Sequence, residues 1–344
     1  MKSYNELTRL GQLRRLRQLA EVALDAYGLT NSRLVFLHYE GNVVFRVDAQ
    51  HPAVVVDKVN PYVPNRYVLR ILSISDADTI RSELTWLAAL RRDAGLSVPE
   101  PIPTLGWKLL IPITTPGVPH GRVVTLLRWV DGRRLIKGRC PTHVRALGRL
   151  MAELHRFAAD WQPPEGFKRF HWDWDGLMGE TGLGHPIDEL VSSMPKQYQK
   201  PVAEVSDQVQ AVMESFGKGS DAYGMIFADM YMENVLFKAE EPRAIDFEDC
   251  GFGYWMYDIG TLMSQCWWTE ERERFREAFL EGHSRVLSLS ESQLAHLELF
   301  VATQYAVALL WSSAFIKHDP ARRAAHEKWR EKEGNNLLRC FAWR

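Results

Sequence analysis

The stretch GMIFADMYMENVLFKAEEPRAIDFEDCGFGYWMYD, residues 224–258, decides the fold. Two short apolar runs, residues 235–237 and 243–245, are separated by a polar segment, a pattern that predicts two strands joined by a tight connection. Asp229 and Asn234 precede the first strand, and Asp246 follows the second. We therefore expect a hairpin that brings three oxygen-bearing side chains to one end.

These side chains are of the kind that a hard cation prefers. Mg²⁺ takes oxygen ligands, keeps several waters and completes its shell with the phosphates of a substrate. A carboxylate that does not bind the metal can accept a proton from an attacking hydroxyl. The spacing predicts phosphoryl chemistry, although an Asp and an Asn at this distance are also common as solvated loop residues.

The same residues resemble a known family. The chain has F-A-D-M-Y-M-E-N at 227–234 and I-D-F-E at 245–248, which is similar to the H-G-D-x-H-x-x-N and I-D-[FW]-[ED] patterns of the aminoglycoside phosphotransferase and choline kinase-like family of the protein-kinase-like fold. The resemblance implies that Asp229 is the catalytic base and that Asn234 and Asp246 bind Mg²⁺. It also implies that Glu248 either is an additional metal group or supports the metal ligands without binding the metal.

Several positions depart from that pattern. Phe227 and Tyr231 stand where the family usually has histidine, and Ala228 stands where it has glycine. None of them is the implied base or a metal ligand, so the departures are compatible with catalysis. They also motivate an alternative, a catalytically weak nucleotide-binding pseudokinase. The later Y-D-I-G sequence implies that Asp258 is a structural acceptor bracing the catalytic loop.

The sequence upstream predicts strands alternating with two helices. Apolar runs predict strands, and amphipathic spacing predicts helices over residues 4–27 and 77–92. Together with the resemblance, this implies an α+β, two-lobe kinase-like fold with a nucleotide-binding lobe at 1–127, built on an antiparallel sheet, and a mainly helical catalytic and acceptor-binding lobe at 128–344. The expected strands of the first lobe are 33–37, 43–47, 67–72, 107–111 and 122–127.

The resemblance also implies a set of nucleotide-binding residues in the first lobe. Gly41 and Asn42 lie in the loop between the first two strands, which would cover the phosphates, although a single glycine also fits an ordinary turn. Arg70 matches the cation that neutralises the α- and β-phosphates, with Glu83 on the next helix as its partner. An ordinary surface ion pair is the alternative interpretation of those two residues.

Residues 128–132 resemble the hinge of the family, where the backbone of Trp129 and Val130 would receive the adenine edge. Within the predicted helix at 143–161, His155 is expected to be a packed structural histidine. Residues 171–175 alternate aromatic and acidic side chains, which would suit a cationic amine. A surface loop anchored by its tryptophans explains the same pattern.

An uncharged run at 299–316 reaches the lower limit of a membrane span. Because polar residues such as Thr303 and Gln304 interrupt it, we expect this helix to be buried inside the second lobe. The charged, amphipathic tail at 318–344 is expected to cover that lobe.

Composition and the resemblance together give the expected function. Lys and Arg number 42 and Asp and Glu 43, so no excess of positive charge favours a nucleic-acid or membrane partner. The 4 scattered cysteines fit a reducing cytoplasm. The resemblance implies ATP- and Mg²⁺-dependent transfer of the γ-phosphoryl group to a small-molecule hydroxyl, on an amino-alcohol, an aminoglycoside or a homoserine-like compound. A protein Ser/Thr kinase of the stress-response type is the alternative acceptor class, and the oligomeric state stays open.

Overall fold

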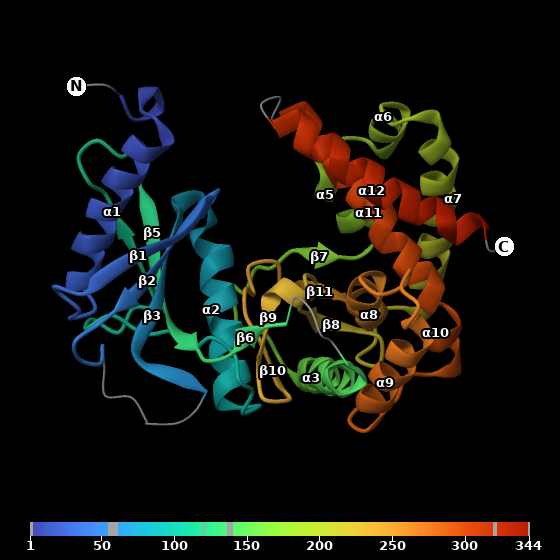
Figure 1. Cartoon of the computed structure of the whole chain (residues 1–344), viewed down its shortest axis with the longest axis horizontal. Helices are drawn as coiled ribbons and strands as arrows, with labels where there is room; N and C mark the ends of the chain where they lie inside the picture. Colours follow the sequence, from blue (N-terminus) through green and yellow to red (C-terminus); the bar gives the residue numbers. More distant parts are fainter. Residues whose placement is uncertain (1–2, 54–60, 120, 136–139, 319–321, 343–344) are drawn as a thin grey trace. The chain divides into compact units, whose positions relative to one another are not determined.

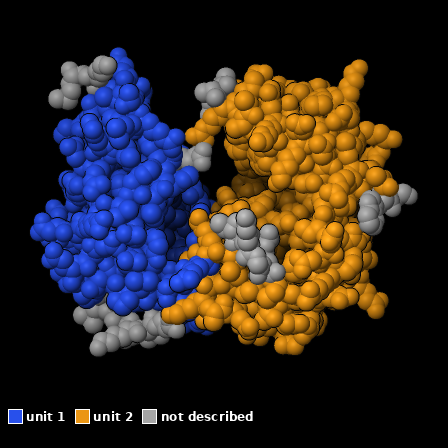
Figure 2. All heavy atoms as spheres, in the orientation of Figure 1, with its two compact units in different colours: residues 1–133, 163–168, 243–248 blue, residues 134–162, 169–242, 249–344 orange. Residues whose placement is uncertain are grey.

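A computed structural model describes residues 3–53, 61–119, 121–135, 140–318 and 322–342 (Figure 1). The chain divides into two compact units (Figure 2). Unit 1 comprises residues 1–133, 163–168 and 243–248, and unit 2 comprises 134–162, 169–242 and 249–344. The expected boundary after residue 127 falls inside a strand, and the two short late segments of unit 1 were not anticipated.

Unit 1 is built on a five-stranded antiparallel sheet with the order β1-β2-β3-β5-β4. The strand expected at 107–111 begins later, at Leu110, because the preceding residues turn: the Trp107 amide donates to the Thr104 carbonyl and Trp107 has φ +60°. The strands are β1 (Arg33–Glu40), β2 (Asn42–Asp48), β3 (Tyr62–Ser73), β4 (Leu110–Ile113) and β5 (Arg122–Val130).

Two helices cover opposite faces of this sheet, α1 (Arg9–Asp25) and α2 (Ala77–Arg92) (Figure 1). Successive side chains of a strand point to opposite faces. Leu69 and Ile71 of β3 accordingly belong to the core that contains the apolar side of α1, and Arg70 between them points towards α2. Two short 3-10 helices, η1 (Tyr4–Glu6) and η2 (Ile74–Asp76), precede the two helices.

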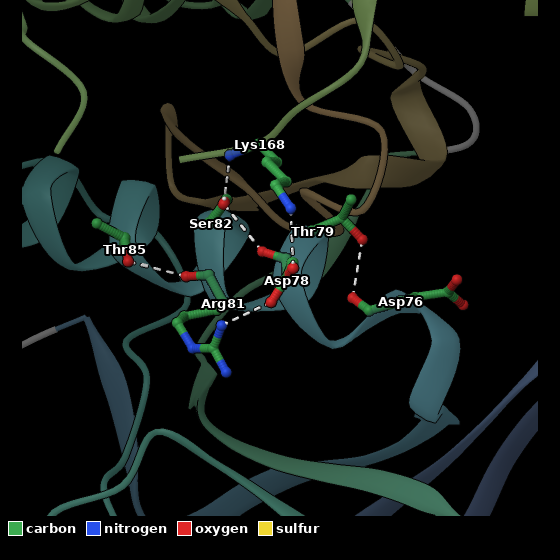
Figure 3. A network of polar contacts seen from close by, with 7 residues as sticks. All are labelled: Asp76, Asp78, Thr79, Arg81, Ser82, Thr85 and Lys168. Atoms are coloured by element: carbon green, nitrogen blue, oxygen red, sulfur yellow. Dashed lines mark hydrogen bonds and ion pairs between the residues drawn. The ribbon is translucent and has the colours of Figure 1, made fainter. Parts of the chain in front are cut away.

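The short segment 163–168 fixes α2 from the side (Figure 3). The backbone amide of Lys168 donates to the Ser82 hydroxyl at 2.8 Å, and its Nζ contacts Asp78 Oδ2 at 3.1 Å. Arg81 Nη1 donates to the other oxygen of Asp78 at 2.8 Å. These contacts hold the first half of α2, where Glu83 also lies.

Unit 2 is mainly helical, and α11 (Leu297–His318) forms its centre. The most apolar window of this helix is 89% buried, and α12 (Arg323–Ala342) packs against it. The expectation of a buried core helix is confirmed, and α12 covers it as predicted for the tail. The other helices are α3 (Pro141–Asp160), α4 (Trp174–Met178), α5 (Glu180–Leu183), α6 (Ile187–Ser192), α7 (Lys196–Phe216), α8 (Trp255–Ser264), α9 (Arg272–Ser284), α10 (Glu291–Ala295) and η3 (Met232–Asn234).

Two glycines allow α3 and α9 to approach each other closely. A Cβ atom on Gly148 would lie 2.1 Å from the Phe279 carbonyl oxygen, and one on Gly282 would lie 1.9 Å from the Arg145 carbonyl oxygen. Glycine has no Cβ, so the two backbones can touch at this crossing. This contact fixes the first half of α3, the helix that carries His155.

Short strands in unit 2 present the motif residues. In a small sheet with the order β7-β11-β8, β8 (Tyr223–Ile226) pairs with β11 (Gly251–Tyr254) in antiparallel register, and β7 (His171–Trp172) pairs with β11 in parallel. The predicted hairpin is formed by β9 (Val235–Lys238) and β10 (Glu241–Ala244), and β6 (Arg133–Arg134) is the remaining strand. The chain passes from unit 2 into unit 1 within β10.

Candidate active site

The loop that follows β8 is fixed by one buried carboxylate. Asp258 of α8 is fully buried and accepts hydrogen bonds from the amides of Phe227 at 3.0 Å and Ala228 at 2.7 Å. His155 Nε2 lies 3.0 Å from the same carboxylate, and its ring stacks on Trp255 with centroids 4.6 Å apart. Asp258 therefore braces the loop that carries Asp229, and His155 is a packed structural residue, both as predicted.

The predicted base lies immediately after these two amides. Asp229 is partly exposed, and Asn234 Nδ2 donates to its Oδ2 atom at 2.7 Å and to its carbonyl oxygen at 3.1 Å. Gln265 holds the loop between them, because it accepts from the Met232 amide at 2.9 Å and donates to the Met230 carbonyl at 3.0 Å. Asp229 and Asn234 are thus brought together as expected.

Two of the departures from the family pattern, Phe227 and Ala228, lie in the part of the loop that Asp258 binds. Ala228 has φ +67°, a left-handed conformation in which glycine is less strained. The Phe227 side chain is buried, so an apolar ring fills the place where a histidine is usual. Both positions still present their amides to Asp258, which is what the loop requires of them.

In unit 1, Arg70 and Glu83 form a buried ion pair. The two side chains are in bidentate contact at 2.8 and 3.1 Å, with the residues only 6% and 1% exposed, and Arg70 Nε also donates to Thr125 at 3.3 Å. Burial opposes the charge of the guanidinium, but the Glu83 carboxylate outweighs it and raises the pKa of Arg70. The interpretation as an ordinary surface pair is wrong, because the pair is desolvated on both sides.

The second predicted motif, Asp246 and Glu248, also belongs to unit 1. Their negative charges contribute to the raised pKa of Arg70. Asn42 Nδ2 donates to Glu248 Oε1, and Gly41 forms the turn between β1 and β2 with φ +70°. Unit 1 therefore contains the predicted cation, both predicted metal carboxylates and the predicted phosphate loop.

The hinge residues lie at the end of β5. The Trp129 ring is flanked by two guanidinium groups, those of Arg46 at 6.0 Å and Arg66 at 5.9 Å from its centroid. Val130 is buried and pairs with Tyr62 of β3. The side chain of Trp129 thus has partners within unit 1, and its predicted role concerns only its backbone.

Predicted metal ligands are divided between the units, with Asn234 in unit 2 and Asp246 and Glu248 in unit 1. Within the described ranges, no three His, Cys, Asp or Glu side chains form a cluster that could hold a metal ion alone. The predicted donors are all oxygens, as a hard cation requires. Because the amide nitrogen of Asn234 is directed to Asp229, its oxygen Oδ1 is the atom available as a ligand.

A cavity of about 720 Å³ opens beside Asp229, with all of its lining residues in unit 2. Its lining residues come mainly from the loop at 228–233, from α8, and from α11 and α12. The lining includes four tryptophans, Trp172, Trp268, Trp311 and Trp329, and four acids, Asp229, Glu233, Asp249 and Glu333.

Lys332 is the one basic residue of this lining, and it pairs with Glu333 at 2.7 Å while its side chain stays 74% exposed. The wall is therefore acidic and aromatic. Sequence reasoning missed the part supplied by α11 and α12. Their helical spacing predicted burial, and nothing in that pattern distinguished a core face from a cavity wall.

In the loop at 171–175, which alternates aromatic and acidic residues, Trp172 and Asp173 have different roles. Trp172 lines the cavity and its indole nitrogen donates to the Asp249 carbonyl at 2.8 Å. Asp173 instead accepts from the Gly176 amide at 3.1 Å and pairs with Lys218 at 2.7 Å. Of the predicted amine contact, Trp172 reaches the cavity, whereas Asp173 caps a helix.

The chain matches the model of the phosphotransferase enzyme family over residues 43–292. It is 24% identical to amicoumacin kinase of Bacillus subtilis in an alignment 227 residues long, which covers 62% of this chain and 62% of that protein. A solved structure of a microcompartment-associated aminopropanol kinase is 25% identical, with a TM-score of 0.75 over 94% of this chain and 99% of that one.

A solved amicoumacin kinase in complex with AMP-PNP and Ca²⁺ has a TM-score of 0.70 at 19% identity, over 94% of this chain and 96% of that one. These likenesses confirm the expected α+β kinase-like fold. The family match covers well over half of the chain and agrees with both sequence motifs. The chain therefore belongs to the phosphotransferase enzyme family.

Proposed function

We propose that this phosphotransferase moves the γ-phosphoryl group of ATP to a hydroxyl of a small amine-bearing alcohol. The cavity beside Asp229 carries the proposal. Its volume of about 720 Å³ lies in the range of small-molecule sites, roughly 300 to 1,000 Å³. A protein Ser/Thr acceptor would bind as an extended segment, so this cavity favours the small-molecule alternative.

The lining supports an amine as the second feature of the acceptor. Tryptophan faces attract cations, and the attraction is stronger where water is excluded. The lining contains four acids and one lysine, and the lysine is already paired with Glu333. The net negative charge of the lining therefore favours a positively charged ligand. A homoserine-like acceptor would bring a carboxylate into the same negative surroundings. Amino-alcohols and aminoglycosides lack that group, and the aminopropanol kinase named above acts, by its name, on an amino-alcohol.

The chain's own residues would divide the chemistry as follows. Asp229 accepts the proton of the acceptor hydroxyl, and the Asn234 amide keeps its carboxylate oriented. Arg70, charged and held by Glu83, binds the phosphates of the nucleotide. Phosphoryl transfer needs little covalent participation from the protein, so these roles are positioning and charge stabilisation.

Asn234 Oδ1, Asp246 and Glu248 would hold the metal. Three oxygen donors of this kind suit Mg²⁺, which offsets the negative charge of the phosphates when bound. The kinase complex with AMP-PNP and Ca²⁺ supports a nucleotide and a divalent cation as ligands of this fold. We place the protein in the cytoplasm, where Mg-ATP is available, with the nucleotide and the acceptor as its partners.

Thermal unfolding tests the nucleotide part first. Wild type with ATP or GTP, each with and without Mg²⁺, is compared with Asp246→Ala. A ligand at 100 times its Kd stabilises the native state by about 2.7 kcal/mol, so a Mg²⁺-dependent rise in Tm is expected with wild type and is lost in the variant. Absence of any shift at saturating nucleotide would refute the nucleotide part of the proposal.

Transfer is then measured on a panel of amino-alcohols, aminoglycosides, homoserine and a Ser/Thr peptide. Asp229→Asn should lower kcat at least about 100-fold, because a general base contributes about 10² to 10⁴, while Mg-ATP binding persists. Asp207→Asn, an exposed carboxylate on α7, is the matched control. Full transfer by the Asp229 variant would refute its assignment.

A further inference from the structure

Tyr231, one of the departures from the family pattern, lines the cavity, and its hydroxyl accepts a hydrogen bond from a side chain of α11. Gln304 Nε2 of α11 donates to the Tyr231 hydroxyl, and the Thr261 hydroxyl donates to Gln304 Oε1 at 3.2 Å. Thr261 is fully buried and Gln304 nearly so. The three groups form a directed chain of hydrogen bonds that ends at the phenol oxygen.

We propose that Tyr231 is a specificity-determining residue whose O–H group donates a hydrogen bond to a second oxygen of the acceptor, separate from the oxygen that is phosphorylated. The inference deepens the proposed function and rests on it for the identity of the reacting hydroxyl. A phenol has one hydrogen and accepts through its lone pairs. Because Gln304 occupies a lone pair, the hydrogen is left to donate.

The described residues leave that hydrogen for a ligand. Gln304 is the side chain with which the Tyr231 hydroxyl forms a hydrogen bond in the part of the chain that the structure describes. Burial raises the pKa of Tyr231 above its ordinary value, and the negative charge of Asp229 raises it further. The phenol therefore stays protonated and acts as a donor at neutral pH.

The neighbouring carboxylate assigns the ligand atom. Asp229 accepts a proton, so it takes the hydroxyl that reacts. Tyr231 donates a proton, so it requires an oxygen with a lone pair that is not being deprotonated, such as a second hydroxyl or an ether oxygen. A carboxylate oxygen of the ligand would meet the acidic lining. The preferred acceptor thus carries an amine and at least two neutral oxygens.

The test compares two ligands that differ by one oxygen, aminopropanol and aminopropanediol. Calorimetry gives the Kd of each for wild type, Tyr231→Phe and Gln304→Glu. In the last variant a carboxylate accepts the phenol hydrogen and turns it away from the cavity. A net hydrogen bond changes affinity by about 3- to 10-fold, so wild type should prefer the diol by that ratio. The ratio should fall to about one in both variants.

Tyr305→Phe is the matched control, because the Tyr305 hydroxyl donates to the Ser264 carbonyl at 2.7 Å. That variant removes a cavity hydroxyl whose hydrogen is already used, and it should keep the wild-type ratio. Thermal unfolding checks that each variant is folded, and Tyr231→Phe decides alone if Gln304→Glu is not.

Three results would overturn the inference: an unchanged ratio in Tyr231→Phe, equal binding of both ligands by wild type, or no binding of either. Phosphoryl transfer is assayed separately on the same two compounds. Discrimination in binding without any transfer would refute the proposed function and leave the role of Tyr231 standing. Transfer to these compounds, with a ratio of Kd values that is the same in wild type and Tyr231→Phe, would support the proposed function and refute the role of Tyr231.

Discussion

Replacing Asp258 by asparagine tests whether one buried carboxylate holds the backbone of the loop that carries Asp229. Its two oxygens accept from two backbone amides and from a histidine, at 2.7 to 3.0 Å. An asparagine has one acceptor oxygen, and its NH2 group must face at least one of these donors. The substitution therefore removes at least one hydrogen bond to a charged group, worth about 1.5 to 3 kcal/mol, and leaves a buried donor unpaired at about 1 to 3 kcal/mol.

Asp258→Asn should accordingly lower the free energy of unfolding of unit 2 by about 2.5 to 6 kcal/mol. Urea unfolding followed by tryptophan fluorescence measures the loss, and amide hydrogen exchange shows where it acts. The amides of Phe227 and Ala228 should lose protection in the variant. Asp207→Asn on the exposed face of α7 should change stability by less than about 0.5 kcal/mol. A loss below about 1 kcal/mol with both amides still protected would refute the reasoning.

Three further changes test the scaffold. Gly148→Ala should destabilise by about 1 to 3 kcal/mol in thermal unfolding, because the new methyl meets a carbonyl oxygen at 2.1 Å; a gain, as expected for Gly106→Ala in an open loop, would contradict it. Glu83→Gln should lower the free energy of unfolding by about 3 kcal/mol or more and raise the KM for ATP, since Arg70 is left charged and buried. An unchanged free energy of unfolding together with an unchanged KM would contradict this prediction. Burial lowers the pKa of His283 to about 3, so the unfolded state, with a pKa near 6.5, binds more protons between these values. The free energy of unfolding should fall by about 1.4 kcal/mol per pH unit below pH 6.5, and comparison of urea midpoints at pH 7 and 5 should show this slope disappearing in His283→Asn.

Most of the fold could be predicted because its signals are local. The spacing of Asp229, Asn234 and Asp246 around two short strands is contained in one continuous stretch, and the resemblance of that stretch supplied the rest of the architecture. The contact of Arg70 with Glu83 was anticipated from one strand and the helix that follows it. Its burial was not, because a single arginine among apolar residues looks the same on an exposed strand.

The cavity beside Asp229 could not be predicted in the same way. Gln304 and Glu333 lie far along the chain from Tyr231, and helical spacing indicates only which face of a helix is covered. A polar residue such as Gln304 looked like an interruption of an apolar run, and the structure shows it instead as the partner of a cavity hydroxyl. Which covered polar residues face a cavity depends on tertiary packing, and no local pattern encodes it.

The division of unit 1 into three stretches of chain has a consequence during synthesis. Domains usually fold from the N-terminus as they leave the ribosome. Here the sheet and both of its helices are complete by Arg133, but Lys168, Asp246 and Glu248 are still to be made. At about 5 to 20 residues per second, the last of them is added about 6 to 23 s later. The first unit must therefore wait for about half of the second to be translated before it acquires its own acidic motif. A nascent chain thus has the sheet long before it has Asp246 and Glu248.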